Sequence, residues 1–394
     1  MDKIAIACFW GSATLVVYAY VIYAILIYLF SRIFGRSQQA PTVVDNDLPT
    51  ASLVLAAYNE DVVIEERLKN ALAMNYPREK YEIVVGSDGC TDKTAEIVRS
   101  FDEQGVKLLD FAQNRGKASV LNDAVAGATG EILLMSDANT RVDTEAARHL
   151  VRWFQDPEVG SVVGRLVLVD PVTGRNADGI YWKYETFLKR CEGRLGALLG
   201  ANGAIYAIRR SLYRPIPAGT IVDDFVIPLL AKQRTGCKII YECDAVAFEE
   251  TPPNVGSEFH RRARIGAGGY QSIGMLWKLL DPRRGWVAFA FFSHKVLRWL
   301  CPFFLISAFV SNLLLVNEPL YRAILILQLA FYFAAFIVAF LPASVKILRP
   351  LRLTTMFVSM NAALLVGFWR WLSGRQRGTW RRTARVGETE GVAK

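Results

Sequence analysis

Residues 52–92 have the sequence SLVLAAYNEDVVIEERLKNALAMNYPREKYEIVVGSDGCTD. Apolar runs at 52–57 and 83–87 predict two strands, and the segment 62–74, with apolar residues at helical spacing, predicts a helix between them. Asn75, Tyr76 and Pro77 end that helix. Further helices are expected at 91–101 and 117–126, and further strands at 106–111 and 131–135. This alternation predicts an α/β fold in which helices cover a parallel sheet.

The predicted strands end in polar residues. These are Tyr58, Asn59 and Glu60 after the first strand, Asp88 and Asp92 after the second, and Asp137 and Asn139 after the fourth. Ligands of parallel α/β sheets bind beyond the carboxyl ends of the strands. Carboxylates and amides that meet there can hold a ribose, a nucleobase and a divalent metal ion. Such residues also cap helices, and for Asp61 and Asp92 capping is an equal alternative.

Apolar segments near both ends predict a membrane protein. The mean hydropathy is +0.23 and 52% of the residues are hydrophobic, which is high for a soluble protein. Residues 4–30 carry no charged side chain and could cross a hydrocarbon core about 30 Å thick; a cleaved signal peptide, the alternative, is shorter. Three more apolar stretches lie at 299–316, 323–341 and 353–369. We therefore expect a transmembrane anchor at 1–31, a soluble domain at 49–285, a block of interfacial and transmembrane helices at 286–372 and a basic tail at 373–394.

Positive charges beside the predicted spans indicate their orientation. Arg32 and Arg36 precede the soluble domain and Arg283 and Arg284 end it, which places it in the cytoplasm, at a membrane of the bacterial inner-membrane type. Six arginines and no acid lie at 370–385. Three true spans would translocate them, so we expect an interfacial last helix and a cytoplasmic tail. Anionic lipid, rather than nucleic acid, is the expected partner of the basic charge.

Six short motifs follow one another along the soluble domain. They are AAYNE (56–60), SDGCTD (87–92), NRGKASVLN (114–122), SDAN (136–139), GANGA (200–204) and VDDF (222–225). In these motifs and their order the sequence resembles the family 2 glycosyltransferases, inverting enzymes with a Rossmann-like GT-A nucleotide-sugar domain. The resemblance covers about residues 51–271, and the apolar segments resemble those of the membrane-bound polysaccharide-synthase branch.

The resemblance implies a site for a nucleotide sugar, which we expect to be a UDP-sugar. The residues that would line the nucleotide pocket are Ala57, Tyr58, Asn59, Glu60 and Asp88. Asp88 would contact the uridine, and Lys117 would approach the nucleobase or the diphosphate as a compact positive charge. A P-loop around Lys117 is excluded, because Phe111 stands where that motif needs glycine.

The resemblance also implies a divalent cofactor, Mg²⁺ or Mn²⁺. Asp137 and Asn139 stand where the family has its metal-binding Asp-x-Asp motif, and Asp137 would also contact the donor. The amide of Asn139 offers an oxygen but no charge. A metal ion there would neutralise the charge that develops on the leaving diphosphate.

Residues 200–204 and 222–225 would supply the rest of the reaction centre. By resemblance Asp224 is the general base that takes the acceptor proton, and Asp223 supports it. Both acids could also simply favour a helix N-terminus. Asn202 and Gly203 would lie beside the donor sugar and the acceptor, although a tight turn before a strand at 204–208 is an alternative.

Two further features bear on the acceptor. Tyr181, Trp182, Tyr184 and Phe187 could form a sugar platform, but a helix face packed on the core is the preferred interpretation. Residues 261–265, RRARI, stand where processive members carry Gln-(Gln/Arg)-x-Arg-Trp. Arg264 is retained and could meet the diphosphate, whereas the tryptophan is missing.

The expected activity is inverting transfer of one sugar, or a few, to a lipid-linked or saccharide acceptor in surface polysaccharide or glycolipid biosynthesis. A processive synthase that also translocates its polymer is the alternative. A third hypothesis is an inactive transferase-like transport or scaffold protein. It is disfavoured because Asp88, Asp137 and Asp224 are all present.

Overall fold

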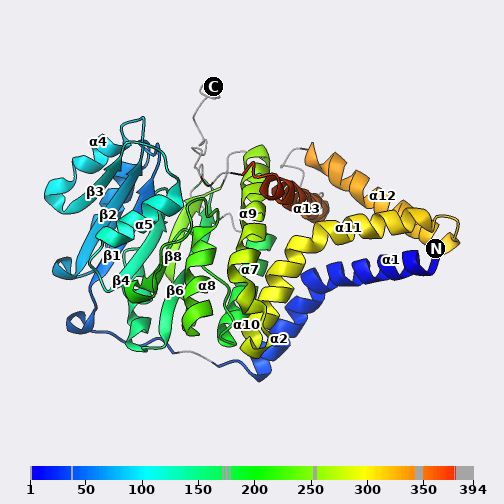
Figure 1. The fold of residues 1–394 in the computed structure, drawn as a ribbon, viewed down its shortest axis with the longest axis horizontal. Helices are drawn as coiled ribbons and strands as arrows, with labels where there is room; N and C mark the ends of the chain where they lie inside the picture. The colour runs from blue at the N-terminus through cyan, green and yellow to red at the C-terminus, as the bar shows by residue number, and fades with distance from the viewer. Residues whose placement is uncertain are drawn as a thin grey trace. The chain divides into compact units, whose positions relative to one another are not determined.

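The computed structural model describes residues 2–36, 39–170, 173, 176, 179–251, 255–341, 349–376 and 378. The chain forms two compact units. The first, called the sheet unit, consists of Ile27–Pro253, Gly274–Ala290 and Arg377–Lys394. The second, called the helical unit, consists of Met1–Leu26, Asn254–Ile273 and Phe291–Gln376. Figure 1 shows both units and labels many of their helices and strands.

The sheet unit contains an eight-stranded mixed sheet. Its strands are β1 (Ala51–Ala57), β2 (Tyr81–Asp88), β3 (Val106–Phe111), β4 (Ile132–Asp137), β5 (Arg141–Val142), β6 (Val159–Val169), β7 (Tyr206–Arg209) and β8 (Lys238–Glu250). Their order across the sheet is β3-β2-β1-β4-β7-β6-β8-β5. Strands β3, β2, β1 and β4 are parallel, as predicted, whereas β7 is antiparallel to β4 and β6. The α/β fold is confirmed, with a mixed sheet in place of the parallel one expected.

Helices cover both faces of this sheet (Figure 1). They are α3 (Ile64–Leu72), α4 (Thr94–Arg99), α5 (Lys117–Gly127), α6 (Ala146–Val151), α7 (Ile180–Arg194) and α8 (Asp223–Thr235). The short helix α10 (Trp286–Ala290) also belongs to the sheet unit. Successive residues of a strand point to opposite faces. Leu53 of β1 therefore packs in one buried cluster with Leu68 of α3. Val54 packs in the other with Val120 of α5 and Val226 of α8.

The strand register aligns the carboxyl ends of three strands. Ala57 of β1 lies opposite Ser87 of β2, and Ala56 lies opposite Asp137 of β4. The polar residues that follow these strands therefore lie along one edge of the sheet. Helices α5 and α8 begin at the same edge, because their first residues, Lys117 and Asp223, form an ion pair.

The helical unit is built from long helices, several of which are strongly apolar. They are α1 (Asp2–Val17), the start of α2 (Tyr23–Ile33), most of α9 (Val255–Leu276), α11 (Leu297–Leu314), α12 (Pro319–Ala339) and α13 (Arg349–Leu372). A π-helical turn at Tyr18–Ile22 joins α1 to α2. Helices α1 and α11 pack together, and Ser12 Oγ donates a hydrogen bond of 3.0 Å to Ser307 Oγ between them.

Four of the described helical segments are long and apolar enough to cross a membrane. They are Asp2–Ile33, Trp286–Leu314, Pro319–Ala339 and Leu351–Leu372. Their length and composition indicate a membrane protein. Most of the predicted basic tail at 373–394 lies outside the described residues. The predicted domain limits and the side on which the tail lies stay predictions.

Candidate active site

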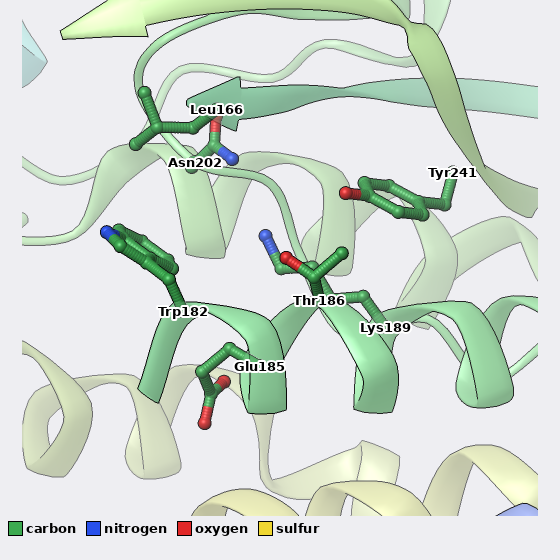
Figure 2. Close-up of a pocket in the computed structure, with 7 residues that line it drawn as sticks. All are labelled: Leu166, Trp182, Glu185, Thr186, Lys189, Asn202 and Tyr241. Carbon is green, nitrogen blue, oxygen red and sulfur yellow. The ribbon is translucent and has the colours of Figure 1, made fainter. Parts of the chain in front are cut away.

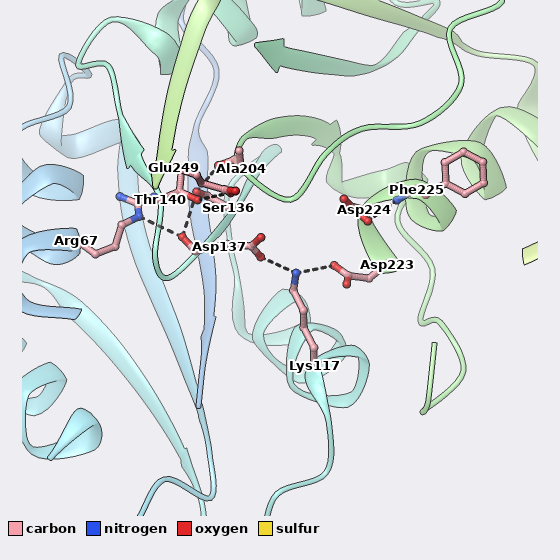
Figure 3. A network of polar contacts seen from close by, with 10 residues as sticks. All are labelled: Arg67, Lys117, Ser136, Asp137, Thr140, Ala204, Asp223, Asp224, Phe225 and Glu249. Carbon is pink, nitrogen blue, oxygen red and sulfur yellow. Dashed lines mark hydrogen bonds and ion pairs between the residues drawn. The ribbon is translucent and has the colours of Figure 1, made fainter. Parts of the chain in front are cut away.

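A lysine and three aspartates come together at the carboxyl edge of the sheet (Figure 3). Asp137 ends β4, Lys117 begins α5, and Asp223 and Asp224 begin α8. The Lys117 ammonium lies 2.6 Å from Asp137 Oδ1 and 3.1 Å from Asp223 Oδ2. The structure thus joins four residues that the sequence placed in three separate motifs.

The charges of this cluster do not cancel, because three carboxylates share one ammonium. Burial, and then the charge of Asp223, raise the pKa of Asp224 to about 6, although Lys117 opposes the change. Burial acts to lower the pKa of Lys117, but attraction to Asp137, Asp223 and Asp224 outweighs it and raises that pKa. A carboxyl group whose pKa lies near neutral pH is suited to proton transfer.

The loop at 200–204 packs against this cluster. The Asp137 N–H donates to the Gly203 carbonyl at 2.9 Å, and the Ala201 N–H donates to the Asp224 carbonyl at 3.3 Å. A Cβ at Gly203 would overlap the Asp137 carboxylate. Glycine at 203 is therefore required by the close approach of the loop to Asp137, while the strand predicted at 204–208 begins at Tyr206.

Asn59 connects the loops that follow β1 and β2. Its φ of 54° lies in the left-handed region. Its Oδ1 accepts a hydrogen bond of 2.8 Å from the Thr91 N–H, and its own N–H donates to Cys90 Sγ at 3.3 Å. Its chain neighbours Tyr58 and Glu60 are half-buried, as Asn59 is, and Ala57 is buried. Their contact with a nucleotide stays a prediction.

Asp92 lies just before α4 and accepts two backbone hydrogen bonds. Its Oδ1 accepts from the Thr94 N–H at 2.9 Å and its Oδ2 accepts from the Asp61 N–H at 3.2 Å. Although burial opposes it, these hydrogen bonds lower the pKa of Asp92. Asp92 thus binds backbone N–H groups of Asp61 and of the first residue of α4, while Lys93 holds the N-cap position.

Asp88 is fully buried and holds the loop that precedes Lys117. Its Oδ1 accepts from the Arg115 N–H at 2.7 Å, and its Oδ2 accepts from the Gly116 N–H at 2.9 Å. Gly116 has a φ of 87°, which favours glycine. Asp88 thus positions the start of α5, and its predicted contact with a uridine stays a prediction.

Arg67 on α3 is a residue of the site that the sequence analysis missed. Its side chain is buried, and its Nε donates to the Asp137 carbonyl at 3.4 Å (Figure 3). Burial lowers the pKa of its guanidinium to about 10, against the opposing effects of Tyr81 and Asp137. Arg67 lies among the apolar residues Ile64 and Leu68 of α3. A charge on that apolar face was the signal that could have identified it.

A small pocket lies beside the 200–204 loop within the sheet unit (Figure 2). It is lined by Leu166, Trp182, Glu185, Thr186, Lys189, Asn202 and Tyr241. Figure 2 shows the Asn202 amide above α7, the helix from which four of these side chains extend. Asn202 Oδ1 is buried and has no hydrogen-bond partner among the described residues. This oxygen could accept a hydrogen bond from a hydroxyl group in the pocket.

The preferred interpretation of the aromatic residues on α7 is wrong. The residues that this helix buries are Glu185, Leu188, Cys191, Glu192 and Gly193. Trp182 lines the pocket, and the side chain of Phe187 is 37% exposed. Phe187 contacts Tyr28 of α2, with ring centroids 5.8 Å apart. The helix directs Leu188 and Cys191 to the core, so the aromatic residues lie on neighbouring faces.

Asp137 and Asn139 are the predicted metal ligands. Asn139 is exposed in the turn after β4. Among the residues with described positions, no group of three or more His, Cys, Asp or Glu is placed to hold a metal ion. Two oxygen ligands are nevertheless sufficient where substrate phosphates complete the coordination. The excess negative charge of the cluster and the side-chain oxygens of Asp137 and Asn139 fit a divalent cation.

Arg264 lies on α9, in the helical unit. In that unit α9 packs closely on α13 at two glycines. A Cβ at Gly266 of α9 would lie 3.1 Å from Leu364, and a Cβ at Gly367 of α13 would lie 2.6 Å from the Ala263 carbonyl. The predicted role of Arg264 at a diphosphate stays a prediction.

The fold and the cluster at its edge define a GT-A glycosyltransferase domain. Residues 52–214 match the family model described as Glycosyl transferase family 2. This stretch of the chain is similar to the family 2 glycosyltransferases.

Curated relatives of the chain are named Poly-beta-1,6-N-acetyl-D-glucosamine synthase. The protein of Staphylococcus aureus (strain COL) is 28% identical over 267 residues, which are 64% of this chain and 63% of the relative. That of Staphylococcus epidermidis is 27% identical over 235 residues, which are 56% of this chain and 55% of the relative. The chain thus spans less than two thirds of these relatives.

A similar solved structure is the mannosyltransferase PcManGT from Pyrobaculum calidifontis, in complex with GDP-Man and Mn²⁺. It has a TM-score of 0.70 and 21% identity, and the match covers 95% of this chain and 99% of that one. At 21% identity, the similarity shows that the two proteins share a fold.

Proposed function

We propose that this protein transfers a sugar from a nucleotide sugar to an acceptor hydroxyl with inversion at the sugar carbon. The position of Asp224 carries this proposal. Its carboxyl group begins α8 beside the Lys117–Asp137 ion pair and has a pKa raised to about 6. A base and a positive charge therefore lie together, as a reaction needs when a hydroxyl loses a proton and a diphosphate leaves.

The residues of the cluster have separate roles in this proposal. Asp224 takes the proton of the acceptor hydroxyl, and Asp223 holds the Lys117 ammonium at 3.1 Å. Lys117 faces the negative charge of the leaving diphosphate. Asp137 and Asn139 would hold Mg²⁺ or Mn²⁺, which neutralises diphosphate charge when bound. Arg264 is proposed to assist at the diphosphate.

The proposed donor is a UDP-sugar. The name of the staphylococcal relatives specifies a polymer of N-acetyl-D-glucosamine, which supports UDP-N-acetylglucosamine as the first donor to test. Tyr58, Asn59 and Glu60 are proposed to contact the nucleotide. GDP-mannose is the alternative donor to test beside UDP-N-acetylglucosamine.

The proposed acceptor is a saccharide or a lipid-linked saccharide at the cytoplasmic face of a membrane. The buried amide oxygen of Asn202, which has no hydrogen-bond partner in the described part of the chain, supports a hydroxyl-bearing ligand in the pocket that it lines. The four candidate spans support an acceptor held near the lipid surface. We propose the bacterial-type inner membrane as the location, with surface polysaccharide or glycolipid as the product.

A processive polysaccharide synthase is the second candidate. The staphylococcal relatives are named as synthases of a polymer, which favours this candidate. The missing tryptophan after Arg264 favours the addition of one sugar or a few. Product length on supplied donor separates the two. Ladders of long chains indicate a synthase, and products extended by one or two sugars indicate the first proposal.

The function is tested with the full chain purified in detergent and a panel of UDP- and GDP-sugars. We expect release of nucleoside diphosphate from one UDP-sugar, dependent on Mg²⁺ or Mn²⁺. Failure of every nucleotide sugar to release nucleoside diphosphate, with and without added saccharide acceptors, would contradict the proposal.

A further inference from the structure

We propose that Lys117 takes the place of a divalent cation at Asp137 in the free protein and is drawn away when a diphosphate binds. Lys117 and the metal ion then compete for one carboxylate. The identity of the diphosphate as part of the donor rests on the proposed function. The competition itself rests on the geometry of the cluster.

The Asp137 carboxylate is partly enclosed, with 31% of its side chain exposed. Oδ1 lies 2.6 Å from the Lys117 ammonium. The other oxygen, Oδ2, lies against Gly203, where a Cβ would overlap it. A cation that binds through Oδ1 must therefore displace the lysine.

The lysine is the part that can move. The loop is fixed by hydrogen bonds that include those from the Asp137 N–H to the Gly203 carbonyl at 2.9 Å and from Ser136 Oγ to the Ala204 carbonyl at 2.6 Å. The Lys117 ammonium is carried by a flexible four-carbon chain. It also has a second partner, Asp223 Oδ2, at 3.1 Å, which can keep it in the cluster after it leaves Asp137.

The charges of the cluster couple the two events. One ammonium neutralises only part of the charge of Asp137, Asp223 and Asp224, so a diphosphate that enters without a second cation meets repulsion. A diphosphate oxygen can attract the Lys117 ammonium and free Asp137 for the metal ion. Binding of the metal and binding of the diphosphate should therefore strengthen each other by the same factor.

The test is an Mn²⁺ titration of the full chain in detergent, read by electron paramagnetic resonance of free Mn²⁺. Without nucleotide, we expect Lys117→Met to bind Mn²⁺ about tenfold more tightly than the natural protein, a typical size for coupling between sites. Addition of UDP should tighten Mn²⁺ binding by the natural protein about tenfold, and by Lys117→Met much less. GDP in place of UDP shows whether the effect needs a particular base.

Two controls separate this effect from a general change of charge. Lys117→Arg keeps the positive charge and should keep the weak Mn²⁺ binding of the natural protein. Lys107→Met also breaks a lysine–carboxylate pair of the sheet unit, since Lys107 lies 2.6 Å from Glu82, and should leave Mn²⁺ binding unchanged. If Lys117→Met fails to fold, Lys117→Gln replaces it.

The proposal is overturned if the uncharged Lys117 variant binds Mn²⁺ no more tightly than the natural protein, or if neither binds it. An equal gain in Lys107→Met would also overturn it. The titration without nucleotide involves no sugar transfer. A clear competition together with no turnover of any nucleotide sugar would therefore contradict the proposed function alone.

Discussion

Asp223 and Asp224 are neighbours in the chain but have different surroundings. Asp223 is 5% exposed and pairs with Lys117. Asp224 is half-buried, and its Oδ1 accepts a hydrogen bond of 2.9 Å from the Phe225 N–H. The carboxylate with the lysine partner suits a supporting role, and the other carboxylate is better placed to receive a proton.

We predict that Asp224→Asn lowers turnover by about 10²- to 10⁴-fold, the usual contribution of a general base. Nucleotide affinity should change little, because the base acts on the acceptor. Steady-state kinetics and a nucleotide titration measure the two effects. Turnover above about a tenth of that of the natural protein would show that Asp224 is not the general base.

The pH dependence of the reaction should report on the same pair. Asp224 must be unprotonated to act as a base, and burial with the charge of Asp223 raises its pKa to about 6. We therefore expect kcat/KM to fall as the pH drops through about 6. Asp223→Asn removes the repulsion and should move this fall to lower pH. A pH profile that is unmoved, or moved upward, in Asp223→Asn would contradict this account.

Single residues were predicted from the sequence where a short motif contains them. Lys117, Asp137 and Asp224 are of this kind, and the structure brings them together. Arg67 contacts Asp137 across 70 positions of the chain, and no local pattern predicts such a contact. The burial of Asp88 likewise depends on the loop at 115–116, which lies outside its own motif.

At the scale of elements, the 200–204 loop and the end of β4 form one structural feature. A Cβ at Gly203 would overlap the Asp137 carboxylate. We predict that Gly203→Ala displaces Asp137 and lowers turnover at least about tenfold, while the fold is retained. Kinetics and thermal unfolding of the variant measure both effects.

Gly274→Ala is the matched control for that variant. A Cβ at Gly274 meets nothing within 4 Å, and alanine is the better helix former in α9 by up to about 1 kcal/mol. Its turnover should match that of the natural protein. Equal turnover of Gly203→Ala and Gly274→Ala would show that the approach of the loop to Asp137 has no role.

The elements themselves were predicted unevenly. The strand predicted at 106–111 has the observed limits of β3, and that at 52–57 begins one residue later than β1, because apolar runs followed by polar turns mark buried strands. The antiparallel strand β7 could not be foreseen, since its direction depends on pairing with β4 and β6. For α7, periodicity gave the helix but not its buried face.

At the scale of the whole molecule, hydropathy located the apolar helices because a span must satisfy its backbone hydrogen bonds internally. The three stretches expected at 299–316, 323–341 and 353–369 fall within the candidate spans Trp286–Leu314, Pro319–Ala339 and Leu351–Leu372 or end two residues beyond them. Orientation depends on the membrane, and positive charge is the argument for it.

We predict that the basic tail lies on the cytoplasmic side, where each exposed arginine gains about 1 kcal/mol at an anionic surface. The segment Leu351–Leu372 is long enough to span a membrane. The alternative is therefore a last helix that spans and a tail on the other side of the membrane. A single cysteine at Thr379, in a background without native thiols, is labelled in intact cells with a membrane-impermeant reagent. Weak labelling supports the prediction, and strong labelling means that the last helix spans.

The most direct test of inverting transfer is the configuration of the first product. The full chain is supplied with an α-linked UDP-sugar and Mn²⁺ or Mg²⁺, and the anomeric proton of the released or transferred sugar is followed by nuclear magnetic resonance before it equilibrates. The proposed attack by an acceptor activated at Asp224 predicts the β anomer, and its loss in Asp224→Asn. An α anomer as the first product would contradict the account.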